Sequence, residues 1–252
     1  MFRAMFQKEF TASWRSFKLI ALLIVFATLG IMSPFVALFT PQILESALQD
    51  QLPGFTIPEP TAYDSFTQLF SNINQMGLII FVIVFGSILT SEFSSGTLIN
   101  LLTKGLRRDV VIHVKAVFVM LVWTIVYAIA ALLAYLYTIY YWDEPLHQLF
   151  GALSTPWLFG IFLISVIFLS SVLFRNFIGV LSSVVIVVII CYLLSIHPSL
   201  SEWLPTYLIG HNIEMLMDKK PFDEMWPAIG VTIGLHTLFF VLTIVRFRKM
   251  EV

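Results

Sequence analysis

Six stretches of the sequence contain no Asp, Glu, Lys or Arg, and each is long enough for the roughly 20 residues that a membrane-spanning helix requires. They are Leu19–Thr40, Ser65–Thr90, Ala116–Tyr141, Ser154–Phe174, Phe177–Ile196 and Trp226–Val245. Only 12% of the 252 residues are charged, whereas a soluble domain contains about 25%. The sequence therefore predicts an all-α integral membrane protein with six transmembrane helices, organised as a single transmembrane domain over residues 1–252.

The basic residues gather on one side of this predicted topology. Twelve of the fourteen Lys and Arg fall in four segments that share that side, namely 1–18, 91–115, 175–176 and 246–252. Only Lys219 and Lys220 fall on the other side, whose segments are rich in Asp and Glu. Because positive residues mark cytoplasmic segments, we expect both termini in the cytoplasm. The predicted location is the cell membrane, as a multi-pass protein of a bacterial cytoplasmic membrane.

Two segments outside the spans are expected to form further helices. Residues 1–18 are interpreted as an amphipathic interfacial helix, because their aromatic residues share one face while Lys8 and Arg15 point the other way. Those aromatic residues are Phe2, Phe6, Phe10, Trp14 and Phe17. The alternative is that they form only the solvated first turns of the next helix. Residues 197–225 are expected to form short external helices before the last span, or an ordinary loop with a few buried anchors.

Residues 91–115 connect the second and third spans and carry six charged residues. Gly96-Thr97 precede Leu98, Leu101 and Leu102, which share one face of a helix at i, i+3, i+4 spacing. Arg107-Arg108 follow this set. Such a helix is suited to a groove on a cytoplasmic partner. The alternative is a solvated, positively charged loop that only sets the topology.

The connector resembles that of the permease subunits of ABC-2 type ABC transporters. The residues that carry the resemblance are Glu92, Gly96-Thr97, Leu101-Leu102-Thr103 and Arg108. The chain departs from the family pattern at Gly105, where Pro is frequent, and at Arg107, where Ser is frequent. The opening of the chain is also similar, with Lys8-Glu9-Phe10 on the interfacial helix and Trp14-Arg15-Ser16 before the first span.

The resemblance implies a permease subunit of an ATP-driven transporter, in a family that generally exports its substrates. Two permeases, identical or paralogous, would form the pathway, and each would bind a cytoplasmic ABC ATPase subunit through the connector, called the coupling helix. By this resemblance Glu92 would end the second span and contact the connector or the N-terminal helix, and Arg107 and Arg108 would lie near the ATPase. ATP and Mg²⁺ would belong to the ATPase, and no cofactor is expected in this chain.

Motifs of self-contained catalysis are missing from the sequence. It has no P-loop, HExxH, CxxC or GxSxG pattern, so we expect no catalytic residues. Membrane lipid is an expected partner and nucleic acid is not. Two other classes of function are weighed: a membrane scaffold or sensor that recruits an ATPase without transport, and an intramembrane hydrolase. The hydrolase would need polar catalytic pairs inside the spans, where only His236 is ionisable.

A few polar residues are candidates for a role of their own. Glu92 is expected to pair with Arg107, Arg108 or Lys8, or to be a solvated helix-end acid. His236 lies halfway along the last span and is either functional or satisfied by a neighbouring hydroxyl or carbonyl. The polar patch Asn72, Asn74 and Gln75 is expected to line the pathway or to form interhelical or dimer contacts. Three histidines on the outer side, His147, His197 and His211, lack ligand spacing, so no metal site is expected.

Overall fold

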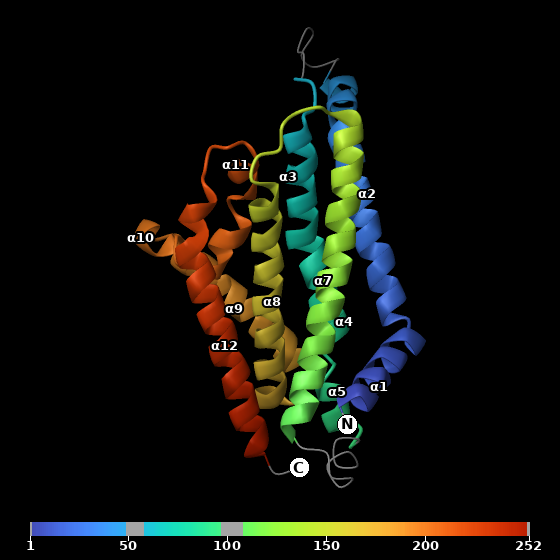
Figure 1. Ribbon diagram of the computed structural model, residues 1–252, viewed down its shortest axis with the longest axis vertical. Helices are drawn as coiled ribbons and strands as arrows, with labels where there is room; N and C mark the ends of the chain where they lie inside the picture. Colours follow the sequence, from blue (N-terminus) through green and yellow to red (C-terminus); the bar gives the residue numbers. More distant parts are fainter. Residues whose placement is uncertain (1, 49–57, 97–107, 251–252) are drawn as a thin grey trace.

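The computed structural model describes residues 2–48, 58–96 and 108–250 (Figure 1). Six helical segments in this part of the chain are long and apolar enough to cross a membrane, and no strand occurs in it. The prediction of an all-α integral membrane protein with six spans is confirmed.

The helices and helical turns follow one another along the chain from α1 to α12. The first half contains α1 (Phe2–Arg15), α2 (Lys18–Leu48), α3 (Ala62–Asn72), the π-helical turn η1 (Ile73–Gly77), α4 (Leu78–Phe85) and α5 (Thr90–Ser94). The second half contains α7 (Arg108–Tyr141), α8 (Leu149–Phe174), α9 (Phe177–Ser195), α10 (Pro198–Ser201), η2 (Pro205–Ile209), α11 (Asn212–Leu216), η3 (Phe222–Met225) and α12 (Trp226–Arg248). The second span is composed of α3, η1, α4 and α5.

Several helices extend past the charge-free runs that predict them. Helix α2 continues through Pro34 and Pro41 to Leu48, so residues 41–48, which lie beyond the predicted first span, are also helical. Helix α7 begins at Arg108, so residues 108–115 of the predicted connector are helical and continuous with the third span. Hydropathy marks only the part of a helix that must be apolar, and a helix can continue into the interface with charged residues.

The long helices run side by side along the molecule, and α1 crosses the end of the bundle at an angle to α2 (Figure 1). The two termini lie at the same end, as an even number of spans requires. We call this end, which holds α1, Arg175 and Arg248, the basic end. The opposite end, which holds Glu144 and the short helices between α9 and α12, is the acidic end.

Trp123 on α7 is the centre of the core. Its indole is fully buried and packs edge-on against Phe26 of α2 and Phe81 of α4. The indole Nε1 donates a hydrogen bond of 2.9 Å to the Trp157 carbonyl of α8. One side chain therefore ties four spans together, and because it satisfies its only donor, the burial carries no polar penalty.

Close helix contacts depend on two glycines. A Cβ on Gly30 of α2 would lie 2.5 Å from the Ala130 carbonyl oxygen of α7, so the two backbones touch at this point. A Cβ on Gly160 of α8 would collide with the Trp123 ring. Small residues at such crossings allow the close packing that drives helix association in lipid.

The segment before the last span folds into the short external helices that the sequence predicts. It contains α10, η2, α11 and η3. Asn212 of α11 anchors it, because its buried Nδ2 donates to the Ala152 carbonyl at 3.1 Å and to Thr155 Oγ1 at 2.7 Å, both on α8. The acidic end is thus capped by a packed structure and not by an ordinary loop.

Candidate functional site: a buried charge cluster at the basic end

Helix α1 packs on the bundle through a polar stripe and turns its aromatic face outward. Met5, Glu9 and Ser13, spaced four residues apart, are its buried residues. The exposed aromatic residues are Phe2, Phe10, Trp14 and, just after the helix, Phe17. Phe6 alone among the predicted aromatic set turns inward and packs edge-on against Phe118. An outward aromatic face beside the first span fits a helix lying in the membrane interface.

The inward stripe brings a carboxylate into a cluster of four charges. Glu9 Oε1 lies 2.9 Å from Nζ of Lys115 on α7, and Glu92 Oε1 on α5 lies 3.1 Å from the same nitrogen. Lys8 Nζ lies 2.6 Å from Glu92 Oε1 and 3.6 Å from Glu9 Oε1. Lys115 also donates to the Ile88 carbonyl at 3.1 Å. Two ammonium groups and two carboxylates therefore neutralise one another.

Three of the four charged side chains are almost inaccessible to solvent. Relative exposure is 2% for Lys115, 7% for Glu9 and 8% for Glu92, while Lys8 at the rim is 43% exposed. Lys115, expected in a connector outside the bilayer, instead lies on α7 and is buried. The two carboxylates that bind it explain this position, since a buried ammonium is stable only when paired and hydrogen-bonded.

The cluster stabilises the charge of Lys8 but leaves one oxygen of Glu92 without a hydrogen bond. Burial alone would lower the pKa of Lys8, but its hydrogen bond to Glu92 and the attraction of Glu92 and Glu9 outweigh burial and raise the pKa above 10.5. Glu92 uses only Oε1, and its buried Oε2 has no hydrogen-bond partner in the described part of the chain. Lys8, one of the three partners expected for Glu92, pairs with it, whereas Arg107 and the side chain of Arg108 lie outside the described part of the chain.

The predicted coupling segment, residues 91–115, contains two members of this cluster. Glu92 lies near its start on α5, and Lys115 is its last residue, on α7. Gly96 ends the preceding helical turn with a left-handed φ of 65°, and Arg108 is the first residue of α7. The remaining residues assigned to ATPase coupling, Thr97, Leu98, Leu101, Leu102 and Arg107, lie outside the described residues.

A second charge contact fixes the start of α7. Arg248 near the end of α12 binds Asp109 with two parallel hydrogen bonds, from Nε and Nη2 to the two carboxylate oxygens, each 2.6 Å long. This bidentate geometry is the strong form of an Arg–carboxylate contact. The first turns of α7 are therefore held on one side by α12 and on the other by α1.

The polar patch of the second span separates into three environments. Asn72 is buried, and its Nδ2 donates to Ser33 Oγ of α2 at 3.1 Å, which makes it an interhelical contact. Asn74 and Gln75 lie in η1, where the π-helical turn interrupts the α-helical register. Asn74 lines a cleft of about 360 Å³ between α4 and α9, with its Oδ1 buried and unpartnered within the described residues, whereas Gln75 is exposed. Turns of this kind are frequent at functional sites.

His236 is held by the backbone of a neighbouring span. Its Nδ1 lies 3.2 Å from the Ile161 carbonyl of α8, and its ring stacks on Phe240. This contact matches the structural alternative stated for this residue, in which a carbonyl satisfies the imidazole. Elsewhere, no three His, Cys, Asp or Glu side chains gather into a metal-binding group in residues 2–48, 58–96 and 108–250.

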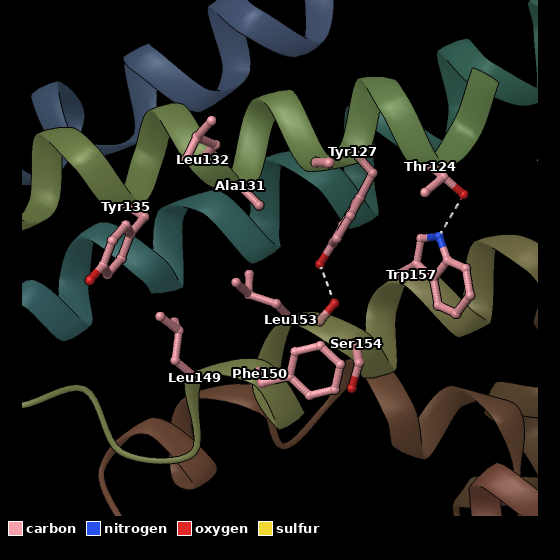
Figure 2. A pocket seen from close by; sticks show the side chains of 11 residues that line it. Thr124, Tyr127, Ala131, Leu132, Tyr135, Leu149, Phe150, Leu153, Ser154 and Trp157 are labelled. Atoms are coloured by element: carbon pink, nitrogen blue, oxygen red, sulfur yellow. Dashed lines mark hydrogen bonds between the residues drawn. The ribbon is translucent and has the colours of Figure 1, made fainter. Parts of the chain in front are cut away.

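A wide apolar groove of about 610 Å³ lies between α7 and α8 (Figure 2). Two of its polar groups are bound within the protein: the Tyr127 hydroxyl donates to the Leu153 carbonyl at 2.7 Å, and Trp157 Nε1 donates to Thr124 Oγ1 at 3.0 Å. Phe150 at its edge is 86% exposed. The groove is therefore an apolar surface with few polar groups that could select a ligand, in contrast to the charge cluster.

Glu9 and Lys115 are members of the site that the sequence pattern does not identify as such. Glu9 lies in the Lys8-Glu9-Phe10 motif, and its four-residue spacing from Met5 and Ser13 places it on the buried face of α1. A carboxylate on the buried face of an interfacial helix is stable only beside a cation. Lys115, the last charged residue before the third apolar run, is that cation.

The fold and this site define a multi-pass, six-span, all-α membrane protein in which an interfacial helix is ion-paired to the second and third spans. No protein-family model matches the chain. The chain is similar to a protein of Bacillus subtilis (strain 168) described as the uncharacterized transmembrane protein YxlG. The two are 24% identical over 254 residues, which cover 98% of this chain and 97% of that protein.

Proposed function

We propose that this chain is the permease subunit of an ATP-driven ABC transporter of the ABC-2 type, working as an exporter in a bacterial cytoplasmic membrane. The observation that carries the proposal is the ion-paired cluster of Lys8, Glu9, Glu92 and Lys115, which joins α1 to the helices before and after residues 97–107. Two copies, or this chain and a paralogue, form the pathway, and separate cytoplasmic ATPase subunits bind ATP and Mg²⁺.

The cluster gives the connector a mechanical role. Residues 97–107 connect α5 to α7, and Glu92 and Lys115 on these two helices are ion-paired, so a displacement imposed on the connection acts on the ends of the second and third spans together. Helix α1 moves with them, because breaking its contact would leave buried charges unpaired, which costs about 3–5 kcal/mol. In this mechanism the nucleotide-driven motion of an ATPase reaches three membrane-associated segments as one unit.

The ATPase contact is assigned to Arg107 and Arg108 and to the leucines Leu98, Leu101 and Leu102. The chain contributes no catalytic residue and binds no cofactor in this mechanism. Asn74 and Gln75 are the candidates for the pathway or for the contact between permeases, since polar side chains rarely face lipid. Asn72 and His236 serve packing, because each already has a partner on a neighbouring span.

The decisive experiment is affinity purification of the tagged chain from native membranes in mild detergent, with identification of the copurifying proteins. We expect a stoichiometric P-loop ATPase with the unmodified chain. The Arg107→Glu/Arg108→Glu variant should lose it, while Lys219→Glu at the exposed acidic end should retain it. A chain that purifies without an ATPase, or a reversed-charge variant that retains it fully, would contradict the proposal.

ATP hydrolysis by the purified complex separates transport from simple recruitment. In a transporter, Glu92→Gln should reduce the ATPase activity that depends on the permease while leaving the ATPase bound. A membrane scaffold that only recruits the ATPase would give the same hydrolysis rate with Glu92→Gln as with the unmodified chain.

A further inference from the structure

A cavity of about 250 Å³ adjoins the charge cluster and shares its four residues. It is bounded by the end of α1, the start of α2, the junction of α4 with α5, and Lys115 of α7. Its lining residues are Lys8, Glu9, Ala12, Ser13, Ser16, Lys18, Phe85, Ile88, Ser91, Glu92 and Lys115. Unlike the apolar groove between α7 and α8 and the cleft between α4 and α9, this cavity is lined mainly by residues with charged or hydroxyl side chains.

The charges of this cavity do not balance. Three lysines and two glutamates line it, which leaves a formal charge of +1. Lys8 and Lys115 bind the two carboxylates, but Lys18 forms no salt bridge within the described residues, where its one hydrogen bond is a 3.5 Å contact to Ser87 Oγ. A half-buried ammonium without an anion is unfavourable, so the cavity is complementary to one negative charge.

Hydrogen-bond donors face the same space. Ser13 and Ser91 are lining residues of the cavity, and the hydroxyl group of neither forms a hydrogen bond within the described residues. Lys18 is the first residue of α2, and the aligned peptide dipoles of a long helix place partial positive charge at that end. Several donors around one surplus positive charge fit an anion with several oxygen atoms better than a single carboxylate.

The cavity also lies at the depth of lipid headgroups. Lys18 is where the first span begins, and exposed Phe10, Trp14 and Phe17 precede it. Aromatic residues at the end of a span and on an interfacial helix mark the boundary between hydrocarbon and headgroups. A phospholipid of the leaflet at the basic end can therefore place its phosphate beside Lys18 while its chains remain in the bilayer.

We propose that this cavity binds the phosphodiester group of a phospholipid from the leaflet at the basic end. Lys18 supplies the neutralising charge, and the Ser13 and Ser91 hydroxyls donate hydrogen bonds to the phosphate oxygens. The phosphodiester carries one negative charge, which matches the surplus of the cavity. The bound lipid fills the space between α1 and the bundle and stabilises α1 in its ion-paired position. This binding is independent of any ATPase.

The test is titration of the delipidated full-length chain with phosphatidylglycerol, with bound lipid counted by native mass spectrometry. Diacylglycerol with the same acyl chains is the matched ligand without a phosphate. We expect one retained phosphatidylglycerol per chain, and little retained diacylglycerol. Lys18→Gln should weaken phosphatidylglycerol binding about fivefold, the factor that one basic residue near an anionic lipid surface contributes.

Two controls make the result specific. Lys18→Arg keeps the positive charge and should bind phosphatidylglycerol as the unmodified chain does. Lys219→Gln, which removes a lysine at the opposite end, should also leave binding unchanged. Equal retention of diacylglycerol, or unchanged binding by Lys18→Gln, would overturn the proposal. Inorganic phosphate that binds as tightly as phosphatidylglycerol would show a site for free anions, which also overturns the assignment to lipid.

Discussion

Glu9 on α1 and Lys115 on α7 form a buried ion pair with 2.9 Å between Oε1 and Nζ, although 106 residues separate them. Glu92 at the end of the second span contacts the same ammonium group at 3.1 Å. One lysine therefore holds together an interfacial helix and the basic ends of two spans. Because the three side chains are buried, removing any one of them leaves a buried charge unpaired and destabilises the protein.

Replacing Lys115 by Met is expected to destabilise the protein more than any other single change in the cluster. The variant leaves Glu9 and Glu92 buried without their shared cation, at a cost of about 3–5 kcal/mol. The measurement is the midpoint of thermal unfolding in detergent, with Lys219→Met as the exposed control. The double variant Glu9→Gln/Lys115→Met should recover part of the loss, since it removes one stranded charge. Additive losses in the double variant would argue against the ion pair.

The contribution of Lys8 to the stability of the folded protein should depend on pH in the alkaline range. The pKa of Lys8 is raised above 10.5 in the folded protein, with Glu92 and Glu9 as the carboxylates that face it and Lys115 as the nearby cation. A lysine whose pKa is higher in the folded state than in the unfolded state stabilises the folded state at any pH below its unfolded-state pKa. This contribution is lost as the pH rises through its folded-state pKa. The stability difference between the unmodified chain and Lys8→Met should therefore be constant at neutral pH and shrink above pH 10.5. A difference that persists unchanged at high pH would mean that packing, not charge, holds Lys8.

The six spans could be predicted from the sequence because hydrocarbon imposes a length and an exclusion of charge that each segment must satisfy by itself. The position of Lys115 could not be predicted in this way. A charged residue is assigned to water by hydropathy, and only the contacts with Glu9 and Glu92, made by distant segments, offset its burial. The same holds for Glu9, which lies on a helix identified by its aromatic face.

The surroundings of the individual residues in the polar patch could not be predicted from the sequence either. Asn72 and Asn74 are two residues apart, yet one turns to α2 and the other to the cleft beside α9. The π-helical turn η1 shifts the helical register within the second span, and such a turn has no signal in the spacing of apolar residues. Sequence reasoning thus identified the patch but not the separate roles of its members.

The crossing of α2 and α7 gives a prediction with an internal control. Gly30→Ala would place a methyl group 2.5 Å from the Ala130 carbonyl oxygen, so the two helices must separate. Strain of this kind costs about 1–3 kcal/mol in a packed interior. Gly234→Ala on α12 adds the same methyl group where no atom lies within 4 Å. Thermal unfolding in detergent should show a lower midpoint for Gly30→Ala only. Equal midpoints for the two variants would mean that α2 and α7 do not approach this closely.

The orientation of the chain decides whether the proposed function is possible. In a Cys191→Ser background, Asp223→Cys should react with an impermeant thiol reagent on intact cells, because the acidic end is expected to face outward. Asn176→Cys, in the turn between α8 and α9 at the opposite end, should react only after permeabilisation. The reverse labelling would place residues 97–107 outside the cell, where no cytoplasmic ATPase can reach them, and the transporter proposal would fail. The expected labelling instead puts the charge cluster and the connector on the side where ATP is hydrolysed, and leaves the copurification experiment to identify the partner.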